Sequence, residues 1–340
     1  MRIELPISKS IANRLLILQA IHGDELMPVS DSMPDDVRIM SEAIRLLGER
    51  QEARIDLGNC GTAMRFLTAY CAQLEGQTTI LDGVERMHHR PIGQLVDALR
   101  EIGADIEYLG EEGFPPLRIK GCILDKHRIV TINNPQSTQF VSALLLIGAN
   151  VQTDSTSPYI YITQEVIKQY QLSPFSYHLS VEKDWSSAAF WYEYVALYGG
   201  EITLLGLSRD SLQGDKIVAD IFAHLGVRTT YTAEGLVISS SPLHPTPYTL
   251  HHDFSACPDL YPAIALTCER LGVELHATGV ESLPLKESDR LRAVREHRTD
   301  ADHRMAMALL IAGYEVDDTA CISKSYPNFI EHFRHINSLK

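Results

Sequence analysis

The sequence predicts an α/β protein of two domains, assembled from repeated helix–strand units. The chain has 340 residues, and a domain commonly holds about 150 residues, which favours two domains. With 45% hydrophobic and 22% charged residues, the composition is typical of a folded globular protein. At several places a helical pattern ends in Gly and a short β-prone run follows, as expected for a left-handed C-cap that leads into a strand. A doubly wound fold has the same periodicity, so the repeat alone does not choose between these two α/β architectures.

Apolar periodicity gives the expected elements in chain order. Residues 11–21 form a helix with Ile11, Leu15 and Leu18 on one face. Further helices are expected at 43–48, 63–74, 95–103, 139–149, 186–198 and 217–226, and strands at 104–109, 227–231 and 273–277. Glycine is expected to cap the helices that end at Gly48, Gly103, Gly226 and Gly272.

Charge and composition exclude several classes of protein. The formal charge is −14, with 30 Lys+Arg against 44 Asp+Glu, which argues against a nucleic-acid-binding protein. An anionic ligand would therefore require that a few cations gather in one place. The chain has no apolar run of about 18 residues, so no membrane span is expected.

The cysteines and histidines give no metal-ligand pattern. Six cysteines without CxxC spacing favour free thiols in a reducing cytoplasm. Cys60, in a glycine-rich loop, is more simply a small filler residue than a nucleophile. The pairs His88–His89 and His251–His252 lack partners at ligand spacing, which favours solvated loop histidines over a metal site.

Several short motifs place cations and hydroxyl groups at helix starts. Lys9, Ser10 and Arg14 stand where a strand leads into a helix that Ser10 can cap, and the free N–H groups there favour an anion. A capped helix with solvated basic residues explains this motif equally well. The glycine-rich loop around Gly61 leads into a helix. Thr62 is expected to cap this helix, and Arg65 lies in its first turn. It matches neither GxxxxGK[ST] nor GxGxxG, so a nucleotide is not indicated.

A second set of motifs combines hydroxyls, acids and cations. Ser137, Thr138 and Gln139 open a helix and suit phosphate or sugar hydroxyls, although simple capping is common there. Acids alternate with cations in 286–291 and 302–307, and a carboxylate beside cations can exchange protons. A salt-bridged helix face is the ordinary alternative for the first of these segments. The tetrapeptide Ile-Ser-Lys-Ser occurs at 7–10 and again at 322–325.

In their order along the chain, these motifs resemble one family. The similarity runs from Leu5 to about Phe333. A single motif is weak, but this many in register are specific. They are SKSxxNR, GNCGTAMR, ERMHHRPIGxLVDALRxxGA, STQFVSALL, VEKDWSSAAF, DFSACPD, KESDRL, DHRMAMAL and SKSYPNF, and they are similar to those of the 5-enolpyruvylshikimate-3-phosphate synthases (3-phosphoshikimate 1-carboxyvinyltransferases).

The resemblance implies a reaction of the shikimate pathway. Shikimate 3-phosphate and phosphoenolpyruvate would give enolpyruvylshikimate 3-phosphate and phosphate by addition and elimination. The two substrates carry phosphates and carboxylates, which require a set of Lys and Arg side chains. The attacked hydroxyl needs a base and the enol carbon needs an acid. No metal or organic cofactor is implied, glyphosate should compete with phosphoenolpyruvate, and the protein is expected to be a cytoplasmic monomer.

The resemblance also implies the roles of individual residues. Catalysis would fall to Asp259, Glu287, Lys324 and Lys9, and His303 would lie beside the pyruvyl group. Shikimate 3-phosphate would be bound by Lys9, Ser10, Arg14, Ser137, Thr138, Gln139, Tyr159, Asp259 and Lys286. Phosphoenolpyruvate would be bound by Lys9, Gly61, Arg90, Gln139, Arg290, Arg304 and Lys324.

The fold implied by the resemblance has two similar globules, each made of three βαβαββ units arranged as an inside-out α/β barrel. A two-strand hinge would join them and let them close on substrate. The first globule, on the shikimate 3-phosphate side, would be 10–181. The second, on the phosphoenolpyruvate and catalytic side, would combine 1–9 with 182–340.

The chain departs from the family pattern in residue type and in length. Phe66 stands where the family has Pro, Thr138 where it usually has Ser, and Ser282 where it has Asn. The stretch 291–301 is too short for the helix, turn and strands that the family has there. We therefore expect that the protein contains residues missing from this sequence, and a genuinely deleted homologue is the alternative.

Two other functions compete with the synthase. A related enolpyruvyl transferase acting on a UDP-sugar is disfavoured, because SKSxxNR and DHRMAM are typical of the shikimate enzymes. A catalytically silent anion-binding homologue is the alternative from a different class. Retention of Asp259, Glu287 and Lys324 argues against it, because a binding protein has no need of an acid–base set.

Overall fold

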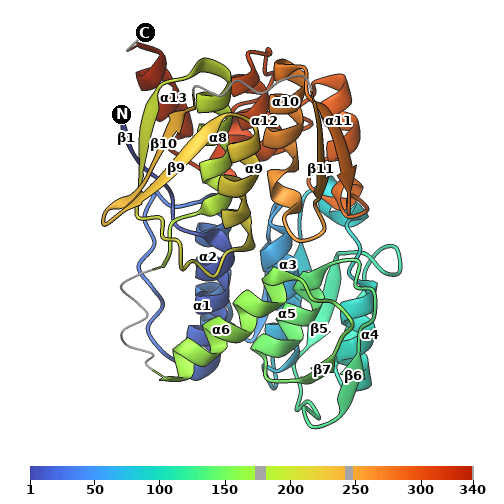
Figure 1. Cartoon of the computed structure of the whole chain (residues 1–340). Helices are drawn as coiled ribbons and strands as arrows, with labels where there is room; N and C mark the ends of the chain where they lie inside the picture. Colours follow the sequence, from blue (N-terminus) through green and yellow to red (C-terminus); the bar gives the residue numbers. More distant parts are fainter. Residues whose placement is uncertain (173–180, 242–247, 339–340) are drawn as a thin grey trace. The chain divides into compact units, whose positions relative to one another are not determined.

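The structure, a computed structural model, describes residues 1–172, 181–241 and 248–338 (Figure 1). The chain forms two compact units. Unit 1 consists of Met1–Ser8, Ser32–Asp35 and Glu182–Lys340, and unit 2 of Lys9–Asp31 and Asp36–Val181. In the described part of both units, no helix combines the length and the apolar character needed to cross a membrane.

Unit 2 contains a four-stranded sheet and a parallel pair of strands. The sheet has the order β2–β3–β5–β4, in which β2 and β3 are parallel and β5 is antiparallel to both neighbours. Along the chain these strands and two helices follow one another as βαβαββ, which is the expected repeat. The strands are β2 (Glu52–Asp56), β3 (Thr78–Asp82), β4 (Asp105–Tyr108) and β5 (Leu117–Lys120), with the parallel pair β6 (Ile129–Thr131) and β7 (Asn150–Gln152). The helices are α1 (Lys9–His22), α2 (Asp35–Glu49), α3 (Gly61–Ala72), α4 (Gly93–Glu101), α5 (Thr138–Leu146) and α6 (Pro158–Leu172), with the 3₁₀ turn η1 (Glu85–His89).

Unit 1 repeats this plan. Its four-stranded sheet has the order β1–β8–β10–β9, with β1 parallel to β8 and β10 antiparallel to both neighbours. The strands are β1 (Arg2–Glu4), β8 (Glu201–Leu205), β9 (Val227–Thr232) and β10 (Gly235–Ser240), with the parallel pair β11 (Thr249–Asp253) and β12 (Glu274–Thr278). The helices are α8 (Trp185–Tyr198), α9 (Val218–His224), α10 (Tyr261–Leu271), α11 (Arg290–Glu296), α12 (His303–Ala312) and α13 (Phe329–Ser338). The 3₁₀ turns are η2 (Gly214–Ile217), η3 (Pro258–Leu260), η4 (Leu283–Leu285) and η5 (Ala320–Lys324).

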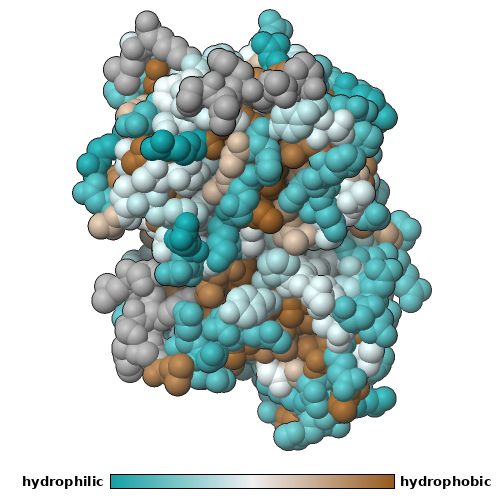
Figure 2. Space-filling model, in the orientation of Figure 1, coloured by the Kyte–Doolittle hydropathy of each residue, from teal (hydrophilic) through white to brown (hydrophobic). Residues whose placement is uncertain are grey.

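In each unit the core is made by helices that are buried on all sides. In α8 every residue from Trp185 to Val195 is buried, and in α3 every residue but Thr62 is buried. A helix that is apolar all round belongs in a core. The strands instead alternate buried and exposed residues, as in β2, so the sheets present one face to solvent. Hydrophilic and hydrophobic residues are interspersed on the face drawn in Figure 2.

The structure confirms most of the expected elements. The helices expected at 11–21, 63–74, 139–149 and 186–198 are α1, α3, α5 and α8. Gly103, Gly226 and Gly272 end their helices with positive φ angles of 102°, 84° and 69°, as a left-handed C-cap requires.

Four local predictions were wrong. Gly48 does not end its helix, because α2 continues to Glu49. Thr62 does not cap α3, which begins at Gly61 behind the N-cap Cys60. Ser10 lies inside α1 instead of capping it. His251 and His252 lie on strand β11 and not in a loop, because β12 supplies a parallel partner that the local sequence does not reveal.

The chain segments that lead from one unit to the other run side by side at residues 6–8 and 182–184. The Ser8 amide donates to the Glu182 carbonyl at 2.7 Å, and the Asp184 amide donates to the Pro6 carbonyl at 2.9 Å. An antiparallel bridge joins Ile7 and Lys183. These contacts form a single antiparallel bridge at the place where the two-strand hinge was expected.

The two parallel pairs show where the chain is short. In the four-stranded sheets, the second parallel strand (β3 or β8) carries an antiparallel neighbour. Within the described ranges, β7 and β12 carry none. After β12 the chain forms α11, and α12 begins only a few residues later, at His303. This connection is too short to hold two strands.

Candidate active site

Unit 1 brings together the acids and cations that the sequence singled out between 259 and 324. Asp259 lies in η3, Arg290 begins α11, and Lys324 ends η5. The N-termini of α11 and α12 are each capped by an aspartate: Asp289 accepts from the Arg292 amide, and Asp302 from the Arg304 amide. The caps fix the first turns of both helices, which carry the predicted site residues Arg290 and Arg304.

Asp259 is surrounded by cations. Its Oδ1 lies 2.8 Å from Arg290 Nη1 and 3.5 Å from Lys286 Nζ, and its Oδ2 lies 2.9 Å from Arg304 Nη2. The side chain is 17% exposed. Asp259 is therefore an ion-paired carboxylate that solvent still reaches, as a general base should be.

Glu287 bridges two cations. Its Oε2 lies 3.1 Å from Arg290 Nη2, and its Oε1 lies 2.8 Å from Lys324 Nζ. The pair with Lys324 is nearly buried, with side chains 10% and 11% exposed. A proton on the lysine ammonium can therefore pass through a carboxylate that it already contacts.

Asp302 contacts the first turns of both α11 and α12. It is fully buried, and its Oδ2 accepts from Arg290 Nε at 2.8 Å and from the Ser288 hydroxyl at 3.1 Å. Arg290 is thus clamped by three carboxylates, those of Asp302, Asp259 and Glu287. His303, which follows the cap, is fully buried.

The nearby carboxylates keep Arg290 and Arg304 charged. Burial alone would lower the pKa of Arg290, but the Asp302, Asp259 and Glu287 carboxylates outweigh it and raise the pKa. The same competition raises the pKa of Arg304, for which Asp259 is the largest opposing charge. For Lys286 burial dominates and the pKa is lowered, in spite of the Asp259 carboxylate. Arg304 Nη1 is buried and has no hydrogen-bond partner among the described residues, so it can receive an anion.

This cluster includes a second buried acid, Asp215, that the sequence did not single out. Asp215, in η2, accepts a short hydrogen bond from the Ser186 hydroxyl. Burial, together with the nearby Asp259 charge, raises the pKa of Asp215 to about 7. A lone acid in Gln213–Gly214–Asp215 has no spacing signal, so only packing could have revealed it.

In unit 2 the predicted residues gather at helix N-termini. Lys9 begins α1, and its Nζ lies 2.8 Å from Asp36 Oδ2. The two side chains are 13% and 3% exposed. Asp36 was also missed by the sequence analysis, although the adjacent pair Asp35–Asp36 at the start of α2 was a visible signal. Cys60 is buried, and its Sγ lies 3.8 Å from the Asp36 carbonyl oxygen, as expected for a filler residue.

Arg14 is fixed by hydrogen bonds to neutral groups. Its Nε donates to Thr163 Oγ1 at 2.7 Å, and its Nη1 donates to the Ser10 carbonyl at 2.6 Å. Its Nη2 donates to Ser142 Oγ at 3.2 Å and to the Tyr159 carbonyl at 3.1 Å. Arginine has five N–H donors, and these bonds use four of them.

Gly61 lies against two guanidinium groups. A side chain at Gly61 would collide with Arg65 and Arg90, so the absence of a Cβ lets both arginines reach the start of α3. Arg65 Nη1 donates to the Gly61 carbonyl at 2.9 Å, and Arg90 Nη1 donates to the Asn59 carbonyl at 3.4 Å. The N-terminus of α3 and two cations therefore meet at one place, which favours an anion.

The start of α5 joins this group. Ser137 is its N-cap and accepts from the Gln139 amide at 3.3 Å, and Thr138 is the first helical residue. Gln139 Nε2 donates to Thr62 Oγ1 at 2.9 Å, which connects the first turns of α5 and α3.

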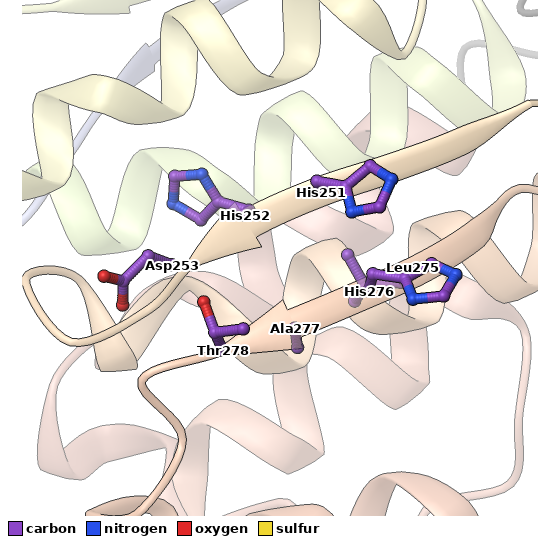
Figure 3. A pocket seen from close by; sticks show the side chains of 7 residues that line it. All are labelled: His251, His252, Asp253, Leu275, His276, Ala277 and Thr278. Atoms are coloured by element: carbon purple, nitrogen blue, oxygen red, sulfur yellow. The ribbon is translucent and has the colours of Figure 1, made fainter.

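A surface cavity of about 570 Å³ lies elsewhere, on the parallel pair β11 and β12 (Figure 3). Its lining includes His251 and His276, whose rings stack at 4.8 Å on neighbouring strands. It contains none of the predicted site residues. Across the described part of the chain, no group of His, Cys, Asp and Glu side chains has the geometry of a metal site.

The two clusters and the repeated α/β units define an anion-binding α/β protein that carries an ion-paired acid–base set. Comparison with known proteins identifies the family. The family model EPSP synthase (3-phosphoshikimate 1-carboxyvinyltransferase) matches residues 1–173, 146–297 and 295–333.

Relatives match over nearly the whole chain. A 3-phosphoshikimate 1-carboxyvinyltransferase of Bacteroides fragilis (strain ATCC 25285) is 37% identical over 393 aligned positions, which cover 98% of this chain and 94% of the relative. One of Cellvibrio japonicus is 31% identical, with coverage of 99% and 96%. The solved structure of EPSP synthase from Acinetobacter baumannii superimposes with a TM-score of 0.66 at 19% identity, with coverage of 98% and 95%.

The chain belongs to the EPSP synthase family. It is a transferase enzyme of the shikimate pathway, which serves aromatic amino acid biosynthesis. Its α/β fold is that of the solved EPSP synthases.

Proposed function

We propose that the chain transfers the enolpyruvyl group of phosphoenolpyruvate to the 5-hydroxyl of shikimate 3-phosphate and releases phosphate. Family membership supports the reaction. The observation that carries the assignment of residues is the buried ion-pair cluster of unit 1, in which Asp259 and Glu287 share Arg290. A protein that only bound anions would gain nothing from acids that neutralise its cations.

Unit 2 supplies the groups proposed for the phosphate and ring of shikimate 3-phosphate. Arg14 has one N–H left over after its four hydrogen bonds within the described residues, and Lys9 is held in place by Asp36. Ser10, Ser137, Thr138, Gln139 and Tyr159 complete this set, and we assign Asp259 and Lys286 to the same substrate.

Phosphoenolpyruvate takes the remaining cations. Arg304 has a buried Nη1 that lacks a partner among the described residues, and Arg90 lies against the side-chain-free Gly61. Charge-assisted bonds from arginine suit a phosphate or carboxylate. Lys9, Gly61, Arg90, Gln139, Arg290, Arg304 and Lys324 form this set.

The reaction proceeds by addition and elimination. Asp259 takes the proton of the 5-hydroxyl, and the hydroxyl oxygen forms a bond to C2 of phosphoenolpyruvate. At the same time C3 gains a proton and becomes a methyl group. The tetrahedral intermediate then breaks the bond from C2 to the phosphate oxygen. Loss of a proton from the methyl group restores the double bond as phosphate departs.

Glu287, Lys324 and Lys9 handle the proton at C3. Ion pairs to two cations favour the carboxylate form of Glu287, so the proton comes from Lys324 through the 2.8 Å contact. Arg290 and Arg304 offset the charge that develops on the departing phosphate. His303 lies beside the pyruvyl group in this proposal.

The same proposal places the enzyme in the cytoplasm as a monomer that needs no cofactor and binds neither nucleic acid nor membrane. Glyphosate, an anionic phosphonate, competes with phosphoenolpyruvate. Sedimentation and inhibition kinetics measure the oligomeric state and the competition.

Phosphate release measured with purified protein tests the reaction. We expect release to require both substrates and to stop in Asp259→Ala and Lys324→Ala. Asp105→Ala and Lys168→Ala, which remove exposed charges in surface ion pairs, serve as matched controls and should keep full activity. Full activity in Asp259→Ala or Lys324→Ala would overturn the role of that residue. No release by the wild-type protein would instead favour a catalytically silent homologue.

A further inference from the structure

Helix α3 presents an aromatic ring to the buried Arg14. The Arg14 guanidinium carbon lies 5.2 Å from the centroid of the Phe66 ring. Arg14 is 2% exposed and Phe66 is 1% exposed, so no solvent separates them.

The environment of Arg14 gives this contact its weight. All four of its hydrogen bonds go to hydroxyl or carbonyl oxygens, and within the described residues no carboxylate forms an ion pair with it. Burial lowers the pKa of Arg14 to about 10, because a desolvated cation is less stable than a solvated one. An aromatic face is electron-rich and attracts a cation within about 6 Å, most strongly when both are desolvated.

A second pair repeats the arrangement one helix further on. The Arg65 guanidinium carbon lies 5.7 Å from the centroid of the Phe140 ring, on α5. Adjacent residues of α3 therefore contact different helices, Phe66 an arginine of α1 and Arg65 a ring of α5. Arg65 also donates from Nη1 to the Gly61 carbonyl at 2.9 Å and from Nη2 to the Pro91 carbonyl at 3.4 Å.

We propose that Phe66 is a positioning residue for Arg14, and that its ring face holds the buried guanidinium where it meets the phosphate of shikimate 3-phosphate. The inference rests on the proposed function, which makes Arg14 a ligand of that phosphate. The ring replaces a carboxylate partner, which would have cancelled the charge that the phosphate needs.

A fluorination series separates attraction to the ring from packing. Each fluorine withdraws electron density from the ring face and changes its size little. We would place phenylalanine with one, two, three and five fluorines at position 66 and measure the dissociation constant of shikimate 3-phosphate by calorimetry without phosphoenolpyruvate. We expect it to rise in steps, reaching about 10-fold for the fully fluorinated ring. Phe66→Tyr should bind as the wild type does, and Phe66→Leu should match the fluorinated extreme.

The control series is made at Phe222, a fully buried ring that packs 5.5 Å from the ring of Tyr192 in unit 1. Fluorination there should leave the dissociation constant unchanged. At position 66, the KM for shikimate 3-phosphate should rise while kcat at saturating substrate changes less than 2-fold.

A dissociation constant that stays flat along the series would overturn the inference, even if the thermal midpoint falls, because the ring would then act by packing alone. An equal effect of both fluorination series would overturn it as well. Absence of phosphate release by the wild-type protein would contradict the proposed function and not this inference, provided that the graded loss of affinity is seen.

Discussion

At the scale of single residues, the acids that the sequence did not reveal are the ones that tune the site. Asp36 contacts Lys9, and Asp215 lies in the field of Asp259. Neither belongs to a motif with a diagnostic spacing. Both are buried, so their effect on a neighbouring charge is weakly screened.

Asp36→Asn tests how Lys9 is held. Because the ion pair is nearly buried, its loss removes the carboxylate that holds the Lys9 ammonium in place. We expect kcat to fall about 10-fold, in line with about 1.5 kcal/mol for a charged hydrogen bond.

Glu42→Gln is the matched control for Asp36, because Glu42 is exposed on the same helix. It should leave kcat unchanged. A wild-type kcat in Asp36→Asn would show that Lys9 does not depend on this carboxylate.

Glu193 is a buried acid outside the proposed site. It lies in α8, is fully buried, and neither carboxyl oxygen has a partner among the described residues. Burial raises the pKa of Glu193 well above its usual value. The folded protein therefore keeps this group neutral at a pH where the unfolded chain ionises it, and stability is lost as pH rises above about 4.5.

Glu193→Gln should remove that loss. We expect the thermal midpoint of the variant to equal that of the wild type near pH 4.5 and to be several degrees higher at pH 8. About 1 kcal/mol corresponds to about 2–4 °C in a protein of this size class. Melting curves across this pH range measure the difference. An identical pH dependence in both proteins would show that Glu193 does not titrate differently on folding.

At the scale of elements, periodicity and glycine positions located most helices, whereas strand partners were decided elsewhere. The helix α3 was expected from one apolar face and is in fact buried almost all round. The parallel pairing of β11 with β12 joins segments on either side of α10, and no local pattern specifies it. His251 was therefore expected in a loop and lies on a strand.

The connection between α11 and α12 stores backbone strain. His297, Asp300 and Ala301 have positive φ angles of 52°, 46° and 56°, and none of them is Gly. This conformation raises the free energy of an L-residue by about 1–2 kcal/mol. The strain coincides with the stretch that is short relative to the family, because a tight connection replaces a longer segment.

Ala301→Gly should relieve part of this strain. We expect the free energy of unfolding to rise by about 0.5–1 kcal/mol, since the gain is reduced by the greater entropy of Gly in the unfolded chain. Denaturant titration measures the change. Ala196→Gly, inside α8, should instead lower stability by about 1 kcal/mol. A loss of stability in Ala301→Gly would show that the left-handed conformation at this residue is not strained.

At the scale of the whole molecule, the chain is shorter than its relatives by internal segments. The alignment with the Bacteroides fragilis relative spans 393 positions and the chain has 340 residues, so at least 53 positions have no counterpart here. The family match also restarts at 295–297, inside the short stretch 291–301. The short stretch 291–301 follows β12, and within the described residues β12 lacks an antiparallel neighbour.

The mass of the purified protein decides between the two explanations of this shortness. Because the family has a helix, a turn and strands where this chain has only 291–301, we expect an intact mass well above 38.0 kDa, and a mass of 38.0 kDa would favour a genuinely deleted homologue. A mass well above that value would show that the protein contains residues that this sequence lacks.

The sequence by itself determined the family, the reaction class and the helix starts that carry the site residues. These are local properties, because caps, glycines and charged motifs act over a few neighbouring residues. Tertiary structure alone decided that Asp36 meets Lys9, that Asp215 lies behind Asp259, and that the ring of Phe66 faces Arg14. Each of these pairs joins different elements, and packing of buried faces, which no local spacing encodes, brings them together.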